Sequence, residues 1–204
     1  MAEQNLSRMP RGRPREFDAG VAVERAMNVF WSRGYQGTSL PDLLEATRLS
    51  RGSLYSAFGD KHGLFLCALD RYIDDALERV ERELDPGKPA LAGLRDCLAG
   101  YVARTSGAAG RRGCLVVATA MELAAHDVEA AQRVRRFFDT MEARMTAALV
   151  RARVEGELAE GIEPASAAHL LLCLLEGLRV LGKTGQERSK SAASVLTFVE
   201  RLAK

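Results

Sequence analysis

Apolar residues recur three and four positions apart along most of this 204-residue chain, a spacing that predicts helices. No segment of any length alternates apolar and polar residues as a strand would. We therefore expect an all-α protein of about nine helices. The expected divisions are an arm at 1–16, a three-helix domain at 17–62 and a larger helical domain at 63–204.

Breaks in the apolar pattern set the expected helix ends. Asp18, preceded by Phe17, is a plausible N-cap for the first helix, and Gly34 is placed to end it. A long helix should run from Lys61 to Leu84, before a break rich in proline and glycine. We expect a loop at 106–113 and further helices at 90–105, 114–125, 127–155, from Pro164, and from Ser189 or Ser191.

The stretch from Thr38 to Lys61 predicts two short helices at a tight angle. Leu54 and Phe58, four residues apart, give the second helix an apolar face. The turn between the helices, residues 47–49, is short enough to indicate a helix-turn-helix. Thr38 is expected either as the N-cap of the first of these helices or as a phosphate ligand.

The other face of the second helix has the chemistry of a DNA-reading surface. Its residues are small, hydroxylic or cationic, and none is acidic: Arg51, Gly52, Ser53, Tyr55 and Ser56. Small residues permit close approach to the major groove, and arginine and serine reach base edges or phosphates. The alternative is an ordinary surface helix of a bundle.

The run from Phe17 to Leu69 resembles the DNA-binding domain of the TetR family of bacterial transcriptional regulators. The matching residues are Ala26, Phe30, Gly34, Tyr35, Thr38, Ser39, Leu40, the block from Leu49 to Tyr55, Phe58, Lys61, Leu64 and Phe65. The resemblance implies a homodimeric repressor with a ligand-receiving C-terminal domain. Arg48 departs from the family, which commonly has glycine in this turn. A positive φ there would cost on the order of 1 kcal/mol, unless the turn differs or Arg48 recovers the cost at a phosphate.

The expected DNA-binding residues extend beyond the second helix. Arginines in the arm flank Gly12 and Pro14, a composition similar to an AT-hook, which lies in a narrow minor groove. A solubilising tail is the alternative for the arm, and a solvated lysine is the alternative for Lys61. The full expected set is Arg11, Arg13, Arg15, Thr38, Arg48, Ser50, Arg51, Gly52, Ser53, Tyr55 and Lys61.

The helix from Pro164 is apolar on almost every side, so it needs cover on every side. We expect a two-fold four-helix interface between two copies, with full burial inside one monomer as the alternative. The expected interface residues are Leu171, Leu174, Leu178, Leu181, Val195, Phe198 and Leu202. A dimer would place two reading helices about 34 Å apart, on two half-sites of a palindrome.

The family resemblance also implies an effector cavity in the second domain, and its apolar side chains favour a hydrophobic ligand. The candidate lining residues are Tyr72, Tyr101, Cys114, Met121, Phe137, Met141 and His169, each with plain core packing as its alternative. Cys114 follows Arg111 and Arg112 and is expected in a first helical turn, where its thiol pKa would be lowered. It is therefore an alternative sensor of oxidants or electrophiles, or else a buried core cysteine.

Composition and motifs narrow the remaining classes of protein. The net charge is +2, the four cysteines form no CxxC pair, and the N-terminal residues lack an apolar signal core, so we expect a reduced, cytoplasmic protein. The most apolar run, 165–175, is about half a membrane span. We expect no enzyme, cofactor or metal site. The Gly177–Thr184 match to a P-loop follows a leucine-rich helix instead of a strand. A helical protein–protein adaptor is the remaining non-regulatory alternative.

Overall fold

The computed structural model describes residues 18–185 and 189–203, which form ten helices and no strand. The first four are α1 (Ala19–Arg33), α2 (Leu40–Thr47), α3 (Arg51–Phe58) and α4 (Lys61–Glu83). The others are α5 (Ala90–Ala103), α6 (Gly107–Arg112), α7 (Leu115–Glu122), α8 (Val128–Val154), α9 (Pro164–Gly182) and α10 (Ser189–Glu200). The all-α prediction is confirmed, while the arm and Phe17 lie outside the described residues.

Side-chain caps explain where the first helices begin. Asp18, Ser50 and Asp60 each accept backbone N–H bonds at the start of α1, α3 and α4. Ser39 caps α2 in a capping box, in which Asp42 accepts the N–H of Ser39 at 2.8 Å. Ser39, and not Thr38, is therefore the N-cap of α2, so that reading of Thr38 is wrong.

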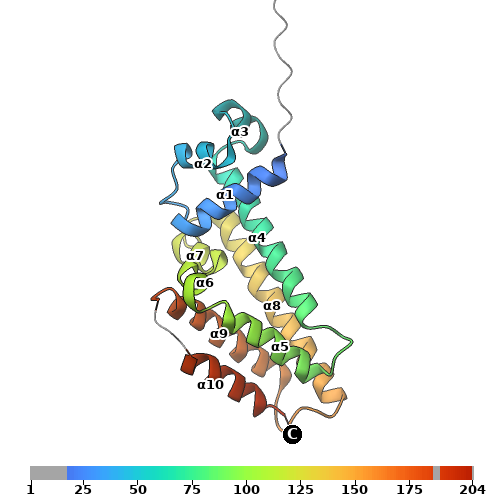
Figure 1. Cartoon of the computed structure of the whole chain (residues 1–204). Coiled ribbons are helices and arrows are strands. Elements are labelled where there is room, and N and C mark those ends of the chain that lie inside the picture. The colour runs from blue at the N-terminus through green and yellow to red at the C-terminus, as the bar shows by residue number, and fades with distance from the viewer. Residues whose placement is uncertain (1–17, 186–188, 204) are drawn as a thin grey trace, which may run out of the picture.

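The helices form an elongated molecule with a small head at one end (Figure 1). The head consists of α1, α2 and α3, and α4 runs from the head down the body beside α8. Buried side chains on α4, among them Leu64, Leu69 and Ile73, belong to one core that continues through both parts. The expected division between residues 62 and 63 falls in the first turn of α4 and stays a prediction.

The short helix α6 occupies a segment that the sequence led us to expect as a loop. It lies against the end of α9, where glycine is needed for close packing. A Cβ on Gly110 would approach the carbonyl oxygen of Thr105 to 2.2 Å, and one on Gly182 would approach the same oxygen to 2.5 Å. The loop prediction for 106–113 is therefore wrong, because tertiary packing stabilises a glycine-containing turn of helix.

By length and composition α9 could cross a membrane, and our expectation of a run too short to do so is corrected. In the fold it packs along α8 and places Leu171 and Leu175 in the core. It also carries Arg179, only 8% exposed. These features are typical of the central helix of a helical domain.

Candidate nucleic-acid interface and sensing domain

The exposed face of α3 is formed as the sequence predicts. Leu54 is fully buried and fixes the inner side of the helix. Arg51 and Gly52 are exposed, and Tyr55 is 45% exposed. The hydroxyl of Ser50 accepts the N–H of Ser53 at 3.0 Å, so local bonds hold the start of the helix. Because α3 contains no acid, this face can approach a phosphate backbone without like-charge repulsion.

The turn before α3 depends on Arg48 in a left-handed conformation, with φ 58° and ψ 26°. It is the one non-glycine residue with positive φ in the described part of the chain. The position does require positive φ, so the conditional cost applies, and the strain is on the order of 1 kcal/mol. Thr47, the residue before Arg48, is held by its own hydroxyl, which donates to the carbonyl of Leu43 at 2.6 Å.

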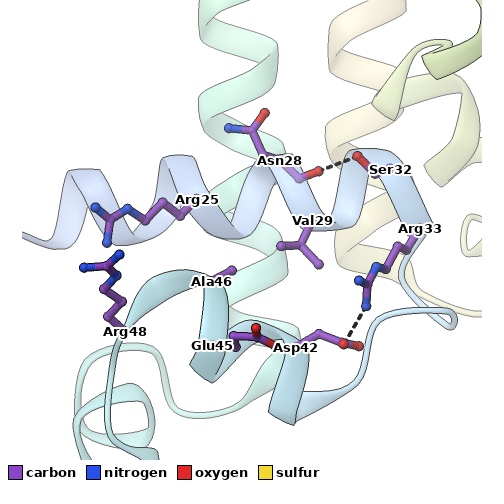
Figure 2. A pocket seen from close by; sticks show the side chains of 9 residues that line it. All are labelled: Arg25, Asn28, Val29, Ser32, Arg33, Asp42, Glu45, Ala46 and Arg48. Carbon is purple, nitrogen blue, oxygen red and sulfur yellow. Dashed lines mark hydrogen bonds and ion pairs between the residues drawn. The ribbon is translucent and has the colours of Figure 1, made fainter.

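A groove of about 670 Å³ lies between α1 and α2 and ends beside this turn (Figure 2). At one end the guanidinium groups of Arg25 and Arg48 point toward one another. At the other end Arg33 pairs with Asp42 at 2.5 Å. Neither Arg25 nor Arg48 has an ion-pair partner among the residues described. Two exposed cations at one edge of the head form a suitable contact for a phosphate.

Two predicted phosphate ligands have other roles in the structure. Thr38 is 1% exposed, and its hydroxyl donates to the carbonyl of Gly34 at 2.6 Å. Its side chain is thus enclosed, and the prediction that it binds phosphate is wrong. Lys61 begins α4 with its Nζ 4.2 Å from the centre of the Tyr35 ring, a cation–π contact. A phosphate contact by Lys61 stays a prediction, and Arg11, Arg13 and Arg15 lie outside the described residues.

Backbone amide groups of the head bind a carboxylate of the body. Glu122, at the end of α7, accepts the N–H of Tyr35 at 3.0 Å and that of Gln36 at 2.6 Å. His62 of α4 contacts Asp127, the N-cap of α8, at 2.7 Å. We call these two contacts the head–body joint. They attach the residues following α1 and the start of α4 to the two ends of the connection from α7 to α8.

The aromatic part of the same region adds to this attachment. The indole N–H of Trp31 donates to the carbonyl of Gly113 at 3.0 Å. The guanidinium of Arg112 lies 3.7 Å from the centre of the Trp31 ring and donates to Asn28. Tyr72 packs edge-on against Trp31, with ring centres 4.8 Å apart. A displacement of α6 or α7 would therefore act directly on α1.

The structure separates the predicted effector residues into different environments. Tyr72 and Tyr101 are buried beside polar groups in the centre of the body. Phe137 and Met141 are core residues at 3% and 1% exposure. Met121 is 83% exposed, so its expected place inside the body is wrong.

His169 is also wrong as an internal lining residue. It is exposed and contacts Glu142 on the surface, at 3.1 Å. The sequence placed both Met121 and His169 on inward faces because their helices are apolar on nearly every side, which leaves the rotation of the helix undetermined.

Cys114 is the N-cap residue of α7 and is 5% exposed. Burial raises the pKa of its thiol, and the nearby Glu176 raises it further. The prediction of a lowered pKa is wrong, because Arg112 turns away to Trp31 and the thiol is enclosed. A sensing role for Cys114 stays a prediction.

Two cavities share Arg179, near the end of α9 where the body meets the head. The smaller, about 110 Å³, lies between α1, α4 and α9 and has Trp31 and Tyr72 in its wall. The larger, about 440 Å³, opens between α7 and α9, with Cys114 in its wall and Met121 at its rim. These are the spaces that the structure offers to a small ligand near the predicted residues.

The apolar stripe predicted for a dimer interface is partly a core stripe. Leu171 and Leu178 on α9, and Val195 and Leu202 near the C-terminus, are buried within one chain. Phe198 is half-buried. The interface prediction is therefore wrong for these four residues, because α9 turns Leu171 and Leu178 toward its own domain and the C-terminal segment buries Val195 and Leu202 there.

The exposed apolar face of α9 lies beside that core stripe. Leu174 and Leu181, which were predicted, share it with Leu170, and these three are between 38% and 47% exposed. Their spacing places them on one side of the helix together with Gly177. This set, Leu170, Leu174, Gly177 and Leu181, is called the α9 outer face below.

Sequence reasoning missed three residues that the structure makes prominent: Arg25, Glu122 and Arg179. Arg25 and Glu122 gave no signal, because their partners lie far away in the sequence or depend on the shape of the turn. Arg179 did give one. Glu176 and Arg179 are charged residues inside an otherwise apolar helix, and such residues are rarely buried without a reason. Among the described residues no cluster of His, Cys, Asp or Glu is placed to hold a metal ion.

Comparisons with known proteins agree with this geometry. The model for bacterial regulatory proteins of the tetR family matches residues 22–68, and that for tetracyclin repressor-like C-terminal domains matches residues 90–195. The HTH-type transcriptional repressor ComR of Escherichia coli is 30% identical over 181 residues, 88% of this chain and 86% of ComR. The uncharacterized HTH-type transcriptional regulator YezE of Bacillus subtilis is 33% identical over 147 residues, 72% of this chain and 76% of YezE.

A solved structure with similar architecture is that of the regulator CifR, as a cysteine mutant complexed with a 26-base-pair operator DNA. It is 32% identical in sequence, with a TM-score of 0.82 over 94% of this chain and all of that one. Reduced NemR of Escherichia coli shares the fold at 21% identity and a TM-score of 0.76, over 91% of this chain and 97% of that one.

Proposed function

Since the chain belongs to the TetR family of bacterial regulatory proteins, we propose that it is a homodimeric repressor that a small effector releases from a palindromic operator. The observation that carries the DNA-binding part is the exposed face of α3, which is free of acids. CifR, with a similar fold over nearly the whole chain, is complexed with operator DNA. In this proposal Arg51, Gly52, Ser53 and Tyr55 approach the major groove, and Arg48 and Lys61 approach phosphates.

The α9 outer face supports the dimer. Its three leucines are exposed on a single chain, and covering them with the same face of a second copy would remove apolar surface from water. Such a two-fold contact would fix the distance between the two α3 helices, which a palindromic operator requires.

Release by an effector requires a ligand that binds one arrangement of the two heads better than the other. The two cavities at Arg179 adjoin the head–body joint, so a ligand there would act on the elements that hold α1 and α4. A partly hydrophobic small molecule suits their walls. We also propose that the protein acts as a repressor in the cytoplasm.

The direct test is a fluorescence anisotropy titration with DNA from upstream of the gene, at about 50 mM and 200 mM salt. A regulator binds one segment preferentially and loses affinity steeply with salt. A protein–protein adaptor shows no sequence preference at either salt concentration.

A double variant locates the binding surface. We expect Arg51→Ala with Tyr55→Ala to weaken operator binding by roughly 100-fold, because each side chain supplies about 1–3 kcal/mol of contact. Arg82→Ala, with the arginine on an exposed part of α4, is the matched control and should bind as the parent does. A double variant that remains dimeric and binds as tightly and as selectively as the parent would disprove the proposed role of α3.

A further inference from the structure

Arg179 is a buried cation that forms no ion pair with any described residue. Its guanidinium lies over the ring of Tyr101, 4.2 Å from the ring centre, and donates to the carbonyl of Arg104 at 3.1 Å. Its Nε is buried and has no hydrogen-bond partner within residues 18–185 and 189–203. No carboxylate in that part of the chain lies within ion-pair distance of it. Because an uncompensated buried charge is strongly unfavourable, this geometry calls for an anion.

Glu176, one turn earlier on α9, forms no ion pair with Arg179 and bonds to Tyr101 instead. One carboxylate oxygen accepts the hydroxyl of Tyr101, and the other is buried without a partner. Burial raises the pKa of Glu176, while the hydrogen bond from Tyr101 and the charge of Arg179 act against that rise. Arg179 and Glu176 thus leave one donor and one carboxyl oxygen unused in the same region.

The larger cavity has the composition of a site for an organic anion. Arg179 is the buried cation of its wall, and Lys183 adds a second, exposed positive charge. Its one carboxylate, Glu122, already accepts two backbone N–H groups at the head–body joint. Apolar side chains also line it: Val117 and Ala118 in the wall, with the exposed Met121 and Val180 at its rim. Its volume of about 440 Å³ is within the usual range for small-molecule sites.

We propose that Arg179 anchors the carboxylate of a small organic acid whose apolar part lies between α7 and α9. A carboxylate suits the planar guanidinium, and charge-assisted hydrogen bonds make this the strongest contact available in the cavity. The regulatory consequence rests on the proposed function. Gly34 and Glu122 belong both to the cavity wall and to the region of the head–body joint. A bound ligand would therefore contact the residues that attach the segment after α1 to the body.

Isothermal titration calorimetry on the full-length protein, without DNA, tests the site. The probes are benzoate and hexanoate, each paired with its uncharged amide, together with inorganic phosphate. We expect a carboxylate to bind saturably and at least about tenfold more tightly than its amide, because a hydrogen bond to a charged group is lost in the amide. Phosphate, which has no apolar part, should bind at least tenfold more weakly than the better carboxylate.

Variants locate the site. Arg179→Met should abolish the preference for carboxylate over amide, and Arg179→Lys should retain part of it. Since a variant of a buried residue can fail to fold, Lys183→Met gives a second test at an exposed position of the wall. It should weaken carboxylate binding about threefold or more and leave the melting temperature unchanged. Lys88→Met, with the lysine in an ion pair with Asp96 outside the cavity wall, is the matched control.

The proposal would be overturned by no binding of either carboxylate, by equal binding of acid and amide, or by undiminished binding to folded Arg179→Met protein. Equal binding of phosphate would also overturn it, because the apolar wall would then play no part. The heat of binding is measured without DNA, so each of these failures leaves the operator titration unaffected. Failure of the operator titration, in turn, leaves the carboxylate site intact.

Discussion

The reading helix α3 and the central helix α9 place their polar side chains in opposite environments. In α3 the polar side chains are exposed or bonded to residues at most three positions away, as Ser50 and Ser53 are. In α9 the partly buried Glu176 and the buried Arg179 contact residues 75 positions away. The comparison indicates that the head presents its polar groups outward to a large partner, while the body encloses polar groups around a small space.

The largest expected effect distinguishes the two sides of α9. Leu171→Ala should lower the free energy of unfolding by about 2–5 kcal/mol, because it opens a cavity in the core. Leu174→Glu, on the α9 outer face, should instead produce monomers that keep their helical content. Chemical denaturation and sedimentation velocity measure the two effects. A dimeric Leu174→Glu protein would contradict the assignment of this face to the interface.

The next effect concerns the joint between the two regions. Glu122→Gln should cost about 1–2 kcal/mol of stability, because the two backbone N–H groups lose a charged acceptor. Thermal unfolding measures the loss, and Glu160→Gln, an exposed glutamate in the loop before α9, is the control. If Glu122→Gln unfolds at the same temperature as the parent, the joint does not hold the head.

A smaller effect isolates backbone strain in the head. Arg48→Gly should stabilise the protein by up to about 1 kcal/mol, because glycine adopts positive φ without strain. Arg48→Ala removes the same side chain and keeps the strain, so the difference in unfolding free energy between the variants reports the backbone alone. Both variants should weaken operator binding equally if the guanidinium contacts a phosphate; unequal losses would assign the effect to the turn.

The smallest expected effect is a difference in how two carboxyl groups make the folding stability depend on pH. Hydrogen bonds from Ser39, with Arg33 nearby, lower the pKa of Asp42 to about 2. The unfolded chain therefore binds more protons as the pH falls below about 4, and this contribution to stability is lost there. Burial raises the pKa of Glu176, so in that case the folded state binds more protons, and stability falls as the pH rises above the unfolded value.

Matched amides test the two signs. Denaturation midpoints measured across the acidic range should show a weaker loss at low pH in Asp42→Asn than in the parent. In Glu176→Gln the decline with rising pH should disappear. If both carboxyl groups changed the denaturation midpoint in the same direction as the pH rises, the environments assigned to Asp42 and Glu176 would be contradicted.

The head was predictable because its structure follows from short-range patterns. The helical period gives Leu54 an inward position and Tyr55 an outward one, and glycine marks the ends of α1 and α3. The choice between Thr38 and Ser39 as N-cap was also present in the sequence, since only Ser39 has an acid three positions later. That signal was overlooked.

The body was less predictable because its helices are apolar on most sides. Period alone does not decide whether Leu170 or Leu171 faces the core, and packing of α9 on α8 decides it. The environment of Cys114 likewise depends on distant residues, since burial near Glu176 outweighs the arginines beside it in the sequence. The basic arm, outside the described residues, stays a prediction.

The bonds that Glu122 makes have a consequence for which substitutions the head–body joint tolerates. Its carboxylate binds main-chain amides, a group that every residue except proline has, so substitutions at Tyr35 or Gln36 leave these bonds available. This half of the joint therefore depends on the course of the main chain after α1, whereas the His62–Asp127 half depends on both side chains.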